Sequence, residues 1–259
     1  MTLERKFFKV WVWTCFVVFF LMVFPFFVLF TLRESWKPAG HFMNKIWAHA
    51  VFGFCFLPCD IVFKFKPNRK QNYIYCANHT SFLDIPSLCY ALPGYFLFIG
   101  KAALVKVPMF GYMFRNLYIA VNRKSPKSRY ETIIQSMAAV DKGRGLAIFP
   151  EGTIPNSNTP YLTPFKDGAF RIAIEKKVPI VPVTIPFNWK ILPDDGDYTP
   201  IKHLMRVVVH EPIDTTNLTL DDVNALRKQT YDIINAELLR QNNLPFPTEK
   251  THEHRPTNN

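Results

Sequence analysis

The sequence of 259 residues lacks the patterns that mark several common classes of protein. Its five cysteines are odd in number and form no Cys-x-x-Cys pair, so neither a disulfide framework nor a cysteine metal site is predicted. No zinc-finger spacing or aromatic RNA-binding signature is present, which makes nucleic acid an unfavourable candidate partner. The Gly-x-Ser-x-Gly turn that would supply an enzyme nucleophile is also missing.

Acidic residues are scarce relative to basic ones. The chain has 20 Asp and Glu against 31 Lys and Arg, a net charge of +11, and the segment 61–140 holds 11 of the basic and 2 of the acidic side chains. Only 20% of residues are charged, whereas 49% are hydrophobic and 25 are Phe, which excludes a disordered protein. The composition favours a protein that meets both an apolar phase and anions, such as a membrane surface or a phosphorylated substrate.

The N-terminal part contains a long uncharged run. Residues 10–32 carry no charge, and as a helix of about 1.5 Å per residue they would be about 35 Å long, enough to cross a bilayer. A signal peptide would have a shorter apolar stretch and a small-residue cleavage site, whereas this run leads into Arg33 and Glu34. The run predicts a membrane helix, kinked at Pro25.

A second uncharged run, 46–59, is too short to cross a bilayer and predicts a re-entrant or interfacial helix. Together the two runs predict a hairpin that seats the rest of the chain on a membrane. Four tryptophans near the ends of these runs are expected to act as interfacial anchors: Trp11, Trp13, Trp36 and Trp47. We expect a membrane-anchoring segment at 1–60, a main domain at 61–243 and a polar tail at 244–259.

The main domain alternates between predicted strands and helices, which is typical of an α/β fold with a mostly parallel or mixed sheet and flanking helices. Strands are predicted at 61–65, 73–77, 95–99, 117–121, 145–149, 180–185 and 206–210. Helices are predicted at 82–91, 109–116, 128–142, 168–176 and 219–242. We expect the first two strands, which a Pro-Asn turn separates, to be adjacent in the sheet.

The segment 78–84, Asn-His-Thr-Ser-Phe-Leu-Asp, stands where a predicted strand ends and a helix begins. Across such a corner, a carboxylate five residues after a histidine can return to the imidazole and orient it as a general base. His79 and Asp84 are therefore candidate catalytic residues. The alternative is a helix cap, in which Thr80 or Ser81 caps the helix and Asp84 favours its positive end.

Three further segments contain candidate binding residues, two of them just after a predicted strand and one at the start of a predicted helix. Glu151, Gly152 and Thr153 follow a predicted strand, where α/β sheets usually hold ligands, although an ordinary turn would look the same. Lys166 and Gly168 stand at the start of a predicted helix, where Lys166 could meet a phosphate or could be a solvated surface residue. Arg123 follows another strand and could bind phosphate with two hydrogen bonds, or it could belong to a basic loop that contacts lipid headgroups.

In this order, the segments resemble the motifs of the lysophosphatidic acid acyltransferase family, within the glycerolipid acyltransferase superfamily. Residues 78–84 match its His-x4-Asp motif, 111–123 its second motif, 149–153 its Phe-Pro-Glu-Gly-Thr motif and 178–183 its last motif. The resemblance covers roughly 61–215 and implies a glycerol-3-phosphate acyltransferase-like fold. The membrane hairpin ahead of the domain also resembles the family's membrane-seating segment.

The resemblance implies acyl transfer from acyl-CoA or acyl carrier protein to a glycerolipid hydroxyl, without a covalent acyl-enzyme and without a metal or resident cofactor. It implies that His79 is the general base, that Asp84 orients it, and that the acceptor is bound by a set of further residues: Arg123, Glu151, Gly152, Thr153, Lys166 and Gly168. The implied location is a membrane, with the catalytic domain on its cytoplasmic face.

One position departs from the family pattern. Ile154 stands where the family often has Arg or Ser, so a cation that would meet the acceptor's phosphate is missing. This leaves three alternatives open: lysophosphatidic acid as acceptor, another lysophospholipid or glycerol 3-phosphate as acceptor, and a membrane lipid-binding protein without catalysis.

Overall fold

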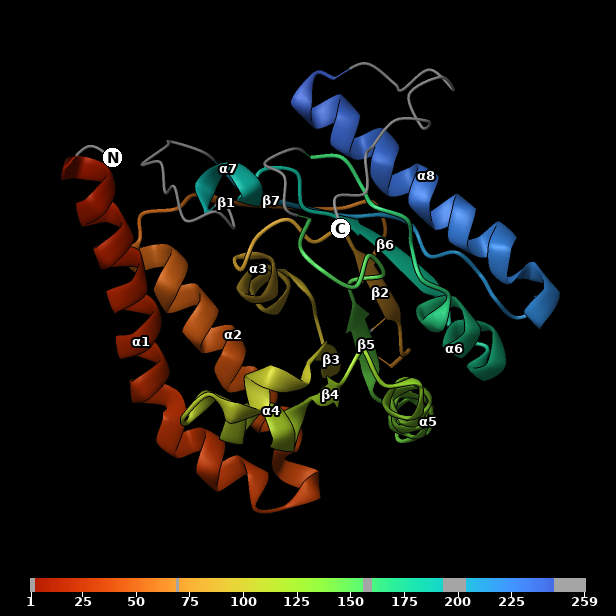
Figure 1. Ribbon diagram of the computed structural model, residues 1–259, viewed down its shortest axis with the longest axis horizontal. Helices are drawn as coiled ribbons and strands as arrows, with labels where there is room; N and C mark the ends of the chain where they lie inside the picture. The colour runs from red at the N-terminus through yellow and green to blue at the C-terminus, as the bar shows by residue number, and fades with distance from the viewer. Residues whose placement is uncertain (1–2, 69, 156–159, 193–203, 245–259) are drawn as a thin grey trace.

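The computed structural model of the chain describes residues 3–68, 70–155, 160–192 and 204–244 (Figure 1). Within these residues a seven-stranded sheet has the order β1-β7-β6-β2-β5-β3-β4. Its strands are β1 Cys59–Phe63, β2 Ile74–Ala77, β3 Phe96–Lys101, β4 Ile119–Val121, β5 Gly145–Ile148, β6 Ile180–Thr184 and β7 Met205–Val209. The strands from β6 to β4 are parallel, whereas β7 is antiparallel to β6 and β1 is parallel to β7. The predicted mixed α/β sheet is confirmed.

Helices cover both faces of this sheet (Figure 1). They are α1 Leu3–Thr31, α2 Lys37–Phe54, α3 Asp84–Ala91, α4 Phe110–Leu117, α5 Pro126–Asp141, α6 Gly168–Lys176, α7 Asn188–Ile191 and α8 Val223–Asn242. Short 3-10 turns occupy Glu34–Trp36, Ala102–Lys106 and Leu220–Asp222. Figure 1 shows α1 to α4 on one side of the strands and α5, α6 and α8 on the other.

The central strands are apolar on both faces because helices cover both. Every residue of β2, β5 and β6 is buried, as expected for parallel strands between two helical layers. The edge strand β1 is only partly buried. Because the central strands are held from both sides, the loops at their carboxyl ends start from fixed positions, and those loops carry the residues of the candidate site.

The first helix agrees with the prediction from the uncharged run. Residues Lys6–Thr31 of α1 are long and apolar enough to cross a membrane, with a mean hydropathy of 2.6, and most of that stretch is not buried against the rest of the chain. Pro25 lies inside α1, and Figure 1 shows the helix bent. The exposed apolar side chains of α1 include Val10, Met22, Phe26 and Leu29.

The second helix differs from the prediction. It begins at Lys37 rather than 46, and one face of it is buried against α1 and α3. Polar side chains on that face find partners in the main domain, because Asn44 Nδ2 donates to the Tyr118 hydroxyl at 2.8 Å and His41 Nδ1 lies 3.2 Å from the same oxygen. One face of α2 is therefore packed against α1 and the main domain, and its placement at a membrane interface stays a prediction.

Trp47 was expected to be an interfacial anchor, and this expectation is wrong. Its side chain is buried and its Nε1 donates to the Phe16 carbonyl oxygen at 3.1 Å, so it joins α1 to α2. Trp11 also contacts the other helix, donating to the Phe54 carbonyl oxygen at 3.0 Å, but it stays partly exposed. The hairpin of two helices is thus held by its own hydrogen bonds.

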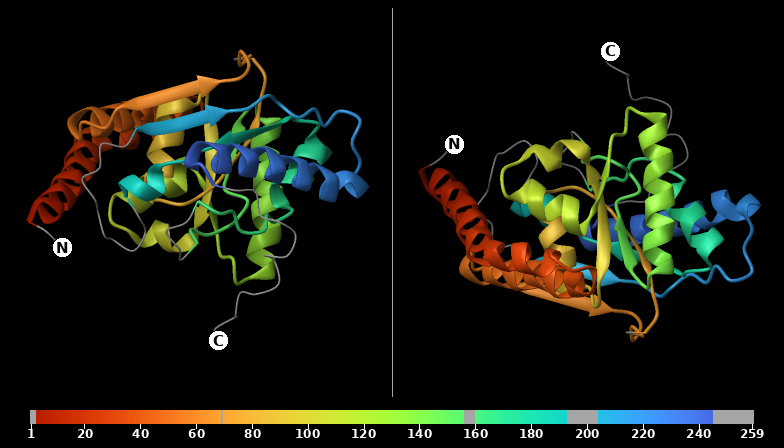
Figure 2. Two further views of the ribbon diagram at one scale, coloured as in Figure 1. Left: turned by 90° about the horizontal axis from the view of Figure 1, so that it is seen from above. Right: turned by 90° about the horizontal axis from the view of Figure 1, so that it is seen from below.

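The expected adjacency of the first two strands is also wrong. β1 and β2 are separated in the sheet by β7 and β6, and β1 pairs with β7 in register from Cys59 with Met205 to Phe63 with Val209. Figure 2 shows β1 and β7 side by side. The division of the chain at 60 and 243 stays a prediction, and the predicted polar tail, apart from Leu244, lies outside the described residues.

Candidate active site

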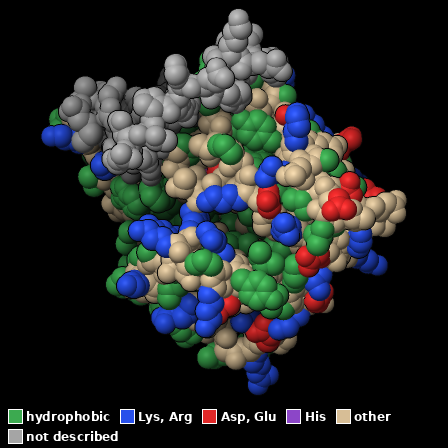
Figure 3. Space-filling model, turned by 45° about the vertical axis from the view of Figure 1, so that its right-hand side comes forward, with side chains coloured by type: hydrophobic (Ala, Val, Ile, Leu, Met, Phe, Trp, Pro, Cys, Tyr) green, Lys and Arg blue, Asp and Glu red, His purple; other side chains and the backbone are tan. Residues whose placement is uncertain are grey.

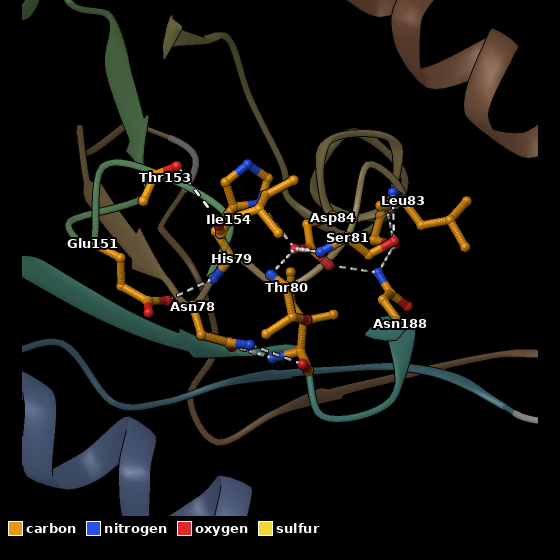
Figure 4. A network of polar contacts seen from close by, with 12 residues as sticks. Asn78, His79, Thr80, Ser81, Leu83, Asp84, Glu151, Thr153, Ile154 and Asn188 are labelled. Carbon is orange, nitrogen blue, oxygen red and sulfur yellow. Dashed lines mark hydrogen bonds and ion pairs between the residues drawn. The ribbon is translucent and has the colours of Figure 1, made fainter. Parts of the chain in front are cut away.

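The loop that follows β2 brings the predicted pair together (Figure 4). His79 Nδ1 lies 2.9 Å from Asp84 Oδ2, across the corner between β2 and α3. Because an ionised carboxylate only accepts hydrogen bonds, Nδ1 carries the proton and Nε2 has a free lone pair. The His79 side chain is 13% exposed, whereas that of Asp84 is fully buried.

Asp84 also organises the loop itself. Its Oδ2 accepts hydrogen bonds from the backbone N–H groups of Thr80 at 2.7 Å and Ser81 at 2.9 Å. The predicted alternative of a helix cap is met in part, because the Ser81 hydroxyl accepts the Leu83 N–H at 3.1 Å just ahead of α3. The carboxylate therefore folds the loop and contacts the imidazole with the same oxygen, which fixes the ring relative to the backbone.

An aromatic residue that follows β5 packs against one face of the His79 imidazole. The His79 ring stacks on the Phe149 ring with 3.9 Å between centroids and 15° between planes. Phe149 is the first residue after β5, the strand next to β2 in the sheet. The ring is thus held by a carboxylate at its edge and by an aromatic ring against one face.

Glu151 is hydrogen-bonded to the backbone of the loop that carries His79. Its Oε1 accepts the backbone N–H of His79 at 2.9 Å, and its Oε2 accepts both the N–H and the hydroxyl of Thr163 at 2.8 Å each. Burial raises the pKa of Glu151, while the bonds from Thr163 and His79 act to lower it. Both carboxylate oxygens are engaged within the protein, so Glu151 positions the histidine backbone in this structure.

Gly152 and Lys166 lie against each other. Gly152 has a φ of +78°, and a Cβ at this position would lie 2.7 Å from Lys166 Nζ. A side chain here would therefore be strained and would displace the ammonium group. The Lys166 backbone N–H donates to the Pro150 carbonyl oxygen at 2.9 Å, which joins this segment to the turn after β5. Thr153 is exposed, and its hydroxyl donates to the Ile154 carbonyl oxygen at 3.3 Å.

A cavity of about 380 Å³ opens beside this turn, between α5 and α6. Four basic side chains line it: Arg123, Arg129, Lys166 and Arg171. Its acidic lining residue, Asp167, is paired with Arg227. Burial lowers the pKa of Arg123. Figure 3 shows Lys and Arg side chains around an apolar hollow on this side of the molecule.

The remaining walls of the cavity are mostly apolar. They include Ile99, Val121, Ile133, Ile148, Phe149 and Ile172. Phe149 therefore joins the two parts of the site, since one of its contacts is the His79 ring and another is the cavity. Clustered cations next to an apolar wall suit a ligand with an anionic head and a hydrocarbon part.

The structure places the predicted site residues in two groups, and His79 and Asp84 are not lining residues of the cavity. His79 and Asp84 are in contact, and Arg123, Gly152, Lys166 and Gly168 line one cavity. Glu151 lies behind the loop rather than in the cavity wall, and Thr153 is not a lining residue. Within the described ranges no group of three or more His, Cys, Asp or Glu side chains could hold a metal ion.

Three residues of this region were missed by the sequence reasoning. Arg129 and Arg171 lie inside helices, where a basic residue usually faces solvent. Asn188 stands three residues beyond the predicted strand 180–185, and its side chain contacts Asp84. Its position after a strand parallel to β2 was the available signal, because the carboxyl ends of parallel strands meet at one edge of the sheet.

Comparison with known proteins agrees with this geometry. Residues 61–186 match the family described as Acyltransferase. The chain is 33% identical over 191 residues to the 1-acyl-sn-glycerol-3-phosphate acyltransferase BAT2, chloroplastic, of Brassica napus, with 73% of this chain and 54% of the relative covered. It is 32% identical over 166 residues to the 1-acyl-sn-glycerol-3-phosphate acyltransferase of Saccharomyces cerevisiae, with 63% and 54% covered.

A solved structure shares the fold. The 1-acyl-sn-glycerophosphate (LPA) acyltransferase PlsC from Thermotoga maritima aligns with a TM-score of 0.75 at 22% identity, over 95% of this chain and 98% of that one. The chain spans about half the length of the curated relatives it matches. Residues 61–186 thus carry a domain of the Acyltransferase family, and the chain shares the fold of the solved structure. Within that class, its sequence is similar to the 1-acyl-sn-glycerol-3-phosphate acyltransferases named above.

Proposed function

We propose that this chain transfers a fatty acyl group from acyl-CoA or acyl carrier protein to the free hydroxyl of 1-acyl-sn-glycerol 3-phosphate, which gives phosphatidic acid for phospholipid biosynthesis. The observation that carries the proposal is the 2.9 Å contact between His79 Nδ1 and Asp84 Oδ2, beside a cavity lined by basic side chains. The relatives from Brassica napus and Saccharomyces cerevisiae are named for the same acceptor, which supports it here.

The reaction needs a base because an alcohol is hardly ionised at neutral pH. His79 Nε2 accepts the proton of the acceptor hydroxyl as its oxygen attacks the thioester carbon. Asp84 stabilises the imidazolium that forms and keeps the proton of the resting ring on Nδ1. When the tetrahedral intermediate collapses, the C–S bond breaks and the imidazolium returns its proton to the thiolate. No side chain is acylated in this sequence.

Acceptor recognition would come from the basic cavity. A phosphomonoester carries up to two negative charges, and Arg123, Lys166 and the neighbouring arginines offer several donors for it. Arg129 and Arg171 supply positive charge to the cavity, whereas Ile154, where the family pattern often has Arg or Ser, supplies none. The apolar wall would take the part of the acceptor nearest the hydroxyl.

Product identification with single acceptors tests the proposal. Purified full-length protein would be given a defined acyl donor, as acyl-CoA or as acyl carrier protein, with lysophosphatidic acid, lysophosphatidylcholine or glycerol 3-phosphate. Mass spectrometry is expected to find phosphatidic acid, with kcat/KM for lysophosphatidic acid about tenfold or more above the others. Preference for another acceptor would support the alternative that Ile154 raises, and absence of transfer to every acceptor would contradict the proposed activity.

We also propose that α1 places the chain in a lipid bilayer, with the main domain on the cytoplasmic face. The support is the apolar surface that α1 exposes, including Met22 at 63% and Phe26 at 48% exposure. Leaving such side chains in water costs roughly 25 cal/mol per Å² of apolar surface. Insertion into lipid removes that cost, and the basic segment 61–140 would meet anionic headgroups.

Flotation with lipid vesicles tests the bilayer assignment in the full chain. Wild-type protein is expected to float with vesicles and to resist alkaline extraction, whereas Met22→Glu with Phe26→Glu should reduce the floating fraction severalfold. A matched double change on a surface helix, Tyr130→Glu with Ile134→Glu in α5, should leave flotation unchanged. Protease digestion of sealed, oriented vesicles would report which face carries the main domain.

A further inference from the structure

One side chain outside the predicted site touches the candidate catalytic pair. Asn188 is the first residue of α7 and is fully buried. Its Nδ2 donates one hydrogen bond to Asp84 Oδ1 at 2.9 Å and one to Ser87 Oγ at 2.9 Å (Figure 4). The two hydrogens of the amide nitrogen are therefore both used, one of them on the carboxylate that contacts His79.

The two oxygens of Asp84 have separate tasks. Oδ2 accepts from the His79 ring and from two backbone N–H groups of the loop, whereas Oδ1 accepts from Asn188. A fully buried carboxylate oxygen without a donor is costly, since it has lost water and gained nothing in return. The Asn188 amide thus holds the half of the carboxylate that the loop does not hold.

The orientation of this amide follows from its neighbours. If the amide were turned over, its oxygen would face the Asp84 carboxylate, and two acceptors would repel each other. In the observed orientation Asn188 Oδ1 is buried and has no hydrogen-bond partner among the described residues. An amide that leaves its own acceptor unsatisfied is present for its donors, and the charged recipient of those donors is Asp84.

The side-chain amide of Asn78 fixes the chain segment that leads to Asn188. Asn78, directly before His79, donates from Nδ2 to the Ile185 carbonyl oxygen at 2.9 Å and accepts the Ile185 N–H at 2.7 Å. These two bonds tie the end of β6 to the end of β2. Only residues 185–187 separate β6 from Asn188. The bonds between Asn78 and Ile185 therefore fix the helix that carries the amide relative to the loop that carries His79.

We infer that Asn188 is a positioning residue for the proposed acyl transfer: its amide holds Asp84 so that Oδ2 points at His79 Nδ1. The inference rests on the proposed function and goes beyond it, because it assigns a role to a residue outside the four family motifs. It predicts an effect on the chemical step and little effect on the binding of either substrate.

Steady-state kinetics of Asn188→Ala tests this inference, with Ser87→Ala as the matched control. Ser87 is equally buried and is the other acceptor of the amide, but its hydroxyl bonds to Asn188 and to the Leu83 carbonyl oxygen rather than to Asp84. Asn188→Ala is expected to lower kcat about 10- to 100-fold, the worth of one hydrogen bond to a charged group, with KM for donor and acceptor within about twofold. Ser87→Ala should stay within about threefold of wild type in kcat.

A shape-conserving variant separates positioning from packing. In Asn188→Asp the introduced carboxyl group can donate to Asp84 only while it is protonated, and once ionised it repels Asp84. The titratable group in hydrogen-bond contact with this position is Asp84, with His79 behind it. The ratio of variant to wild-type kcat should therefore fall as pH rises, while thermal unfolding confirms that the variant stays folded across the range.

Three outcomes would overturn the inference while leaving the proposed reaction in place. The first is an active wild type with an equally active Asn188→Ala variant. The second is an equal loss of kcat in Asn188→Ala and Ser87→Ala, which would assign the effect to packing at this end of α3. The third is a ratio of Asn188→Asp to wild type that does not change with pH. Absence of acyl transfer in the wild type would instead contradict the proposed function.

Discussion

Two histidines in this molecule sit in opposite electrostatic settings. His79 has a buried carboxylate on Nδ1 and part of its side chain exposed. His210, next to the end of β7, is buried with its Nε2 2.8 Å from the Thr184 hydroxyl. Burial, helped by the charge of Lys64, lowers the pKa of His210 to about 4. The first ring can hold a positive charge beside Asp84, whereas the second is kept neutral.

The difference teaches that the partner, and not the residue type or the burial alone, decides what a histidine can do. An imidazole with an anion on one nitrogen and an open path to the other can take up and return a proton. An imidazole enclosed by a hydroxyl and nearby cations can only complete a hydrogen-bond network. Substitutions at and around the two histidines test this contrast, and the largest effect is expected at His79.

The largest effect is expected from removing the imidazole at each position. His79→Gln should lower kcat by roughly 10³–10⁴, the upper part of the range for general-base assistance. His210→Gln should leave kcat within about threefold of wild type, since neither His210 nor its hydrogen-bond partner Thr184 lines the cavity. Initial rates of acyl transfer at saturating substrate measure both, and a His79→Gln variant as active as wild type would remove the proposed mechanism.

The next largest effect is expected from changing the partner while keeping the ring. Asp84→Asn keeps the shape of the side chain but removes the charge, and its amide can no longer accept all of the bonds from His79, Thr80 and Ser81. We expect kcat to fall about 10²-fold or more, with the fold retained by circular dichroism. If Asp84→Asn kept wild-type kcat, the contrast between the two histidines would have another cause.

A smaller effect is expected from the cavity. Arg123→Ala should raise KM for a phosphorylated acceptor about tenfold, because it removes one charged donor, and should change KM for the acyl donor less than twofold. Arg206→Ala is a suitable control, since Arg206 is paired with Asp60 on the edge strand and lines no part of the cavity. Equal increases in both KM values would mean that Arg123 does not read the acceptor.

The smallest effect is expected at His210, and it concerns stability. Because the pKa of His210 is lowered from 6.5 to about 4 in the folded protein, the unfolded chain binds a proton first as pH falls. The folded state should lose stability between about pH 6.5 and pH 4, by about 3 kcal/mol at most from this group. Thermal unfolding as a function of pH measures the loss, and His210→Gln should show a shallower pH dependence. A variant with the wild-type slope would contradict this assignment.

The parts of the structure that local pattern determines were predictable. The apolar strands, the helices that follow β2, β3, β4 and β5, and the return of Asp84 to His79 all depend on residues a few positions apart. The start of α2 was not predictable in this way, because its polar residues His41 and Asn44 are buried by Tyr118, more than seventy residues away. Periodicity reports which residues are apolar, and it does not report which polar residues find a distant partner.

Strand order and the support of Asp84 escaped prediction for the same reason. Consecutive strands are often neighbours, yet β1 pairs with β7, and nothing in residues 61–77 indicates this. Asn188 lies 104 positions from Asp84, so its contact is a property of the assembled sheet rather than of any segment. The catalytic pair could be found from seven residues, whereas the groups that hold it could be found only in three dimensions.

The pairing of β1 with β7 also has a consequence for biosynthesis. Cys59–Phe63 leaves the ribosome roughly 140 residues before Met205–Val209, its partner strand, exists. At about 5–20 residues per second, translation takes roughly 7–28 s to cover that distance. During this interval the nascent chain carries an unpaired strand directly behind its emerging apolar helices. Completion of the sheet is therefore tied to release of the last quarter of the polypeptide.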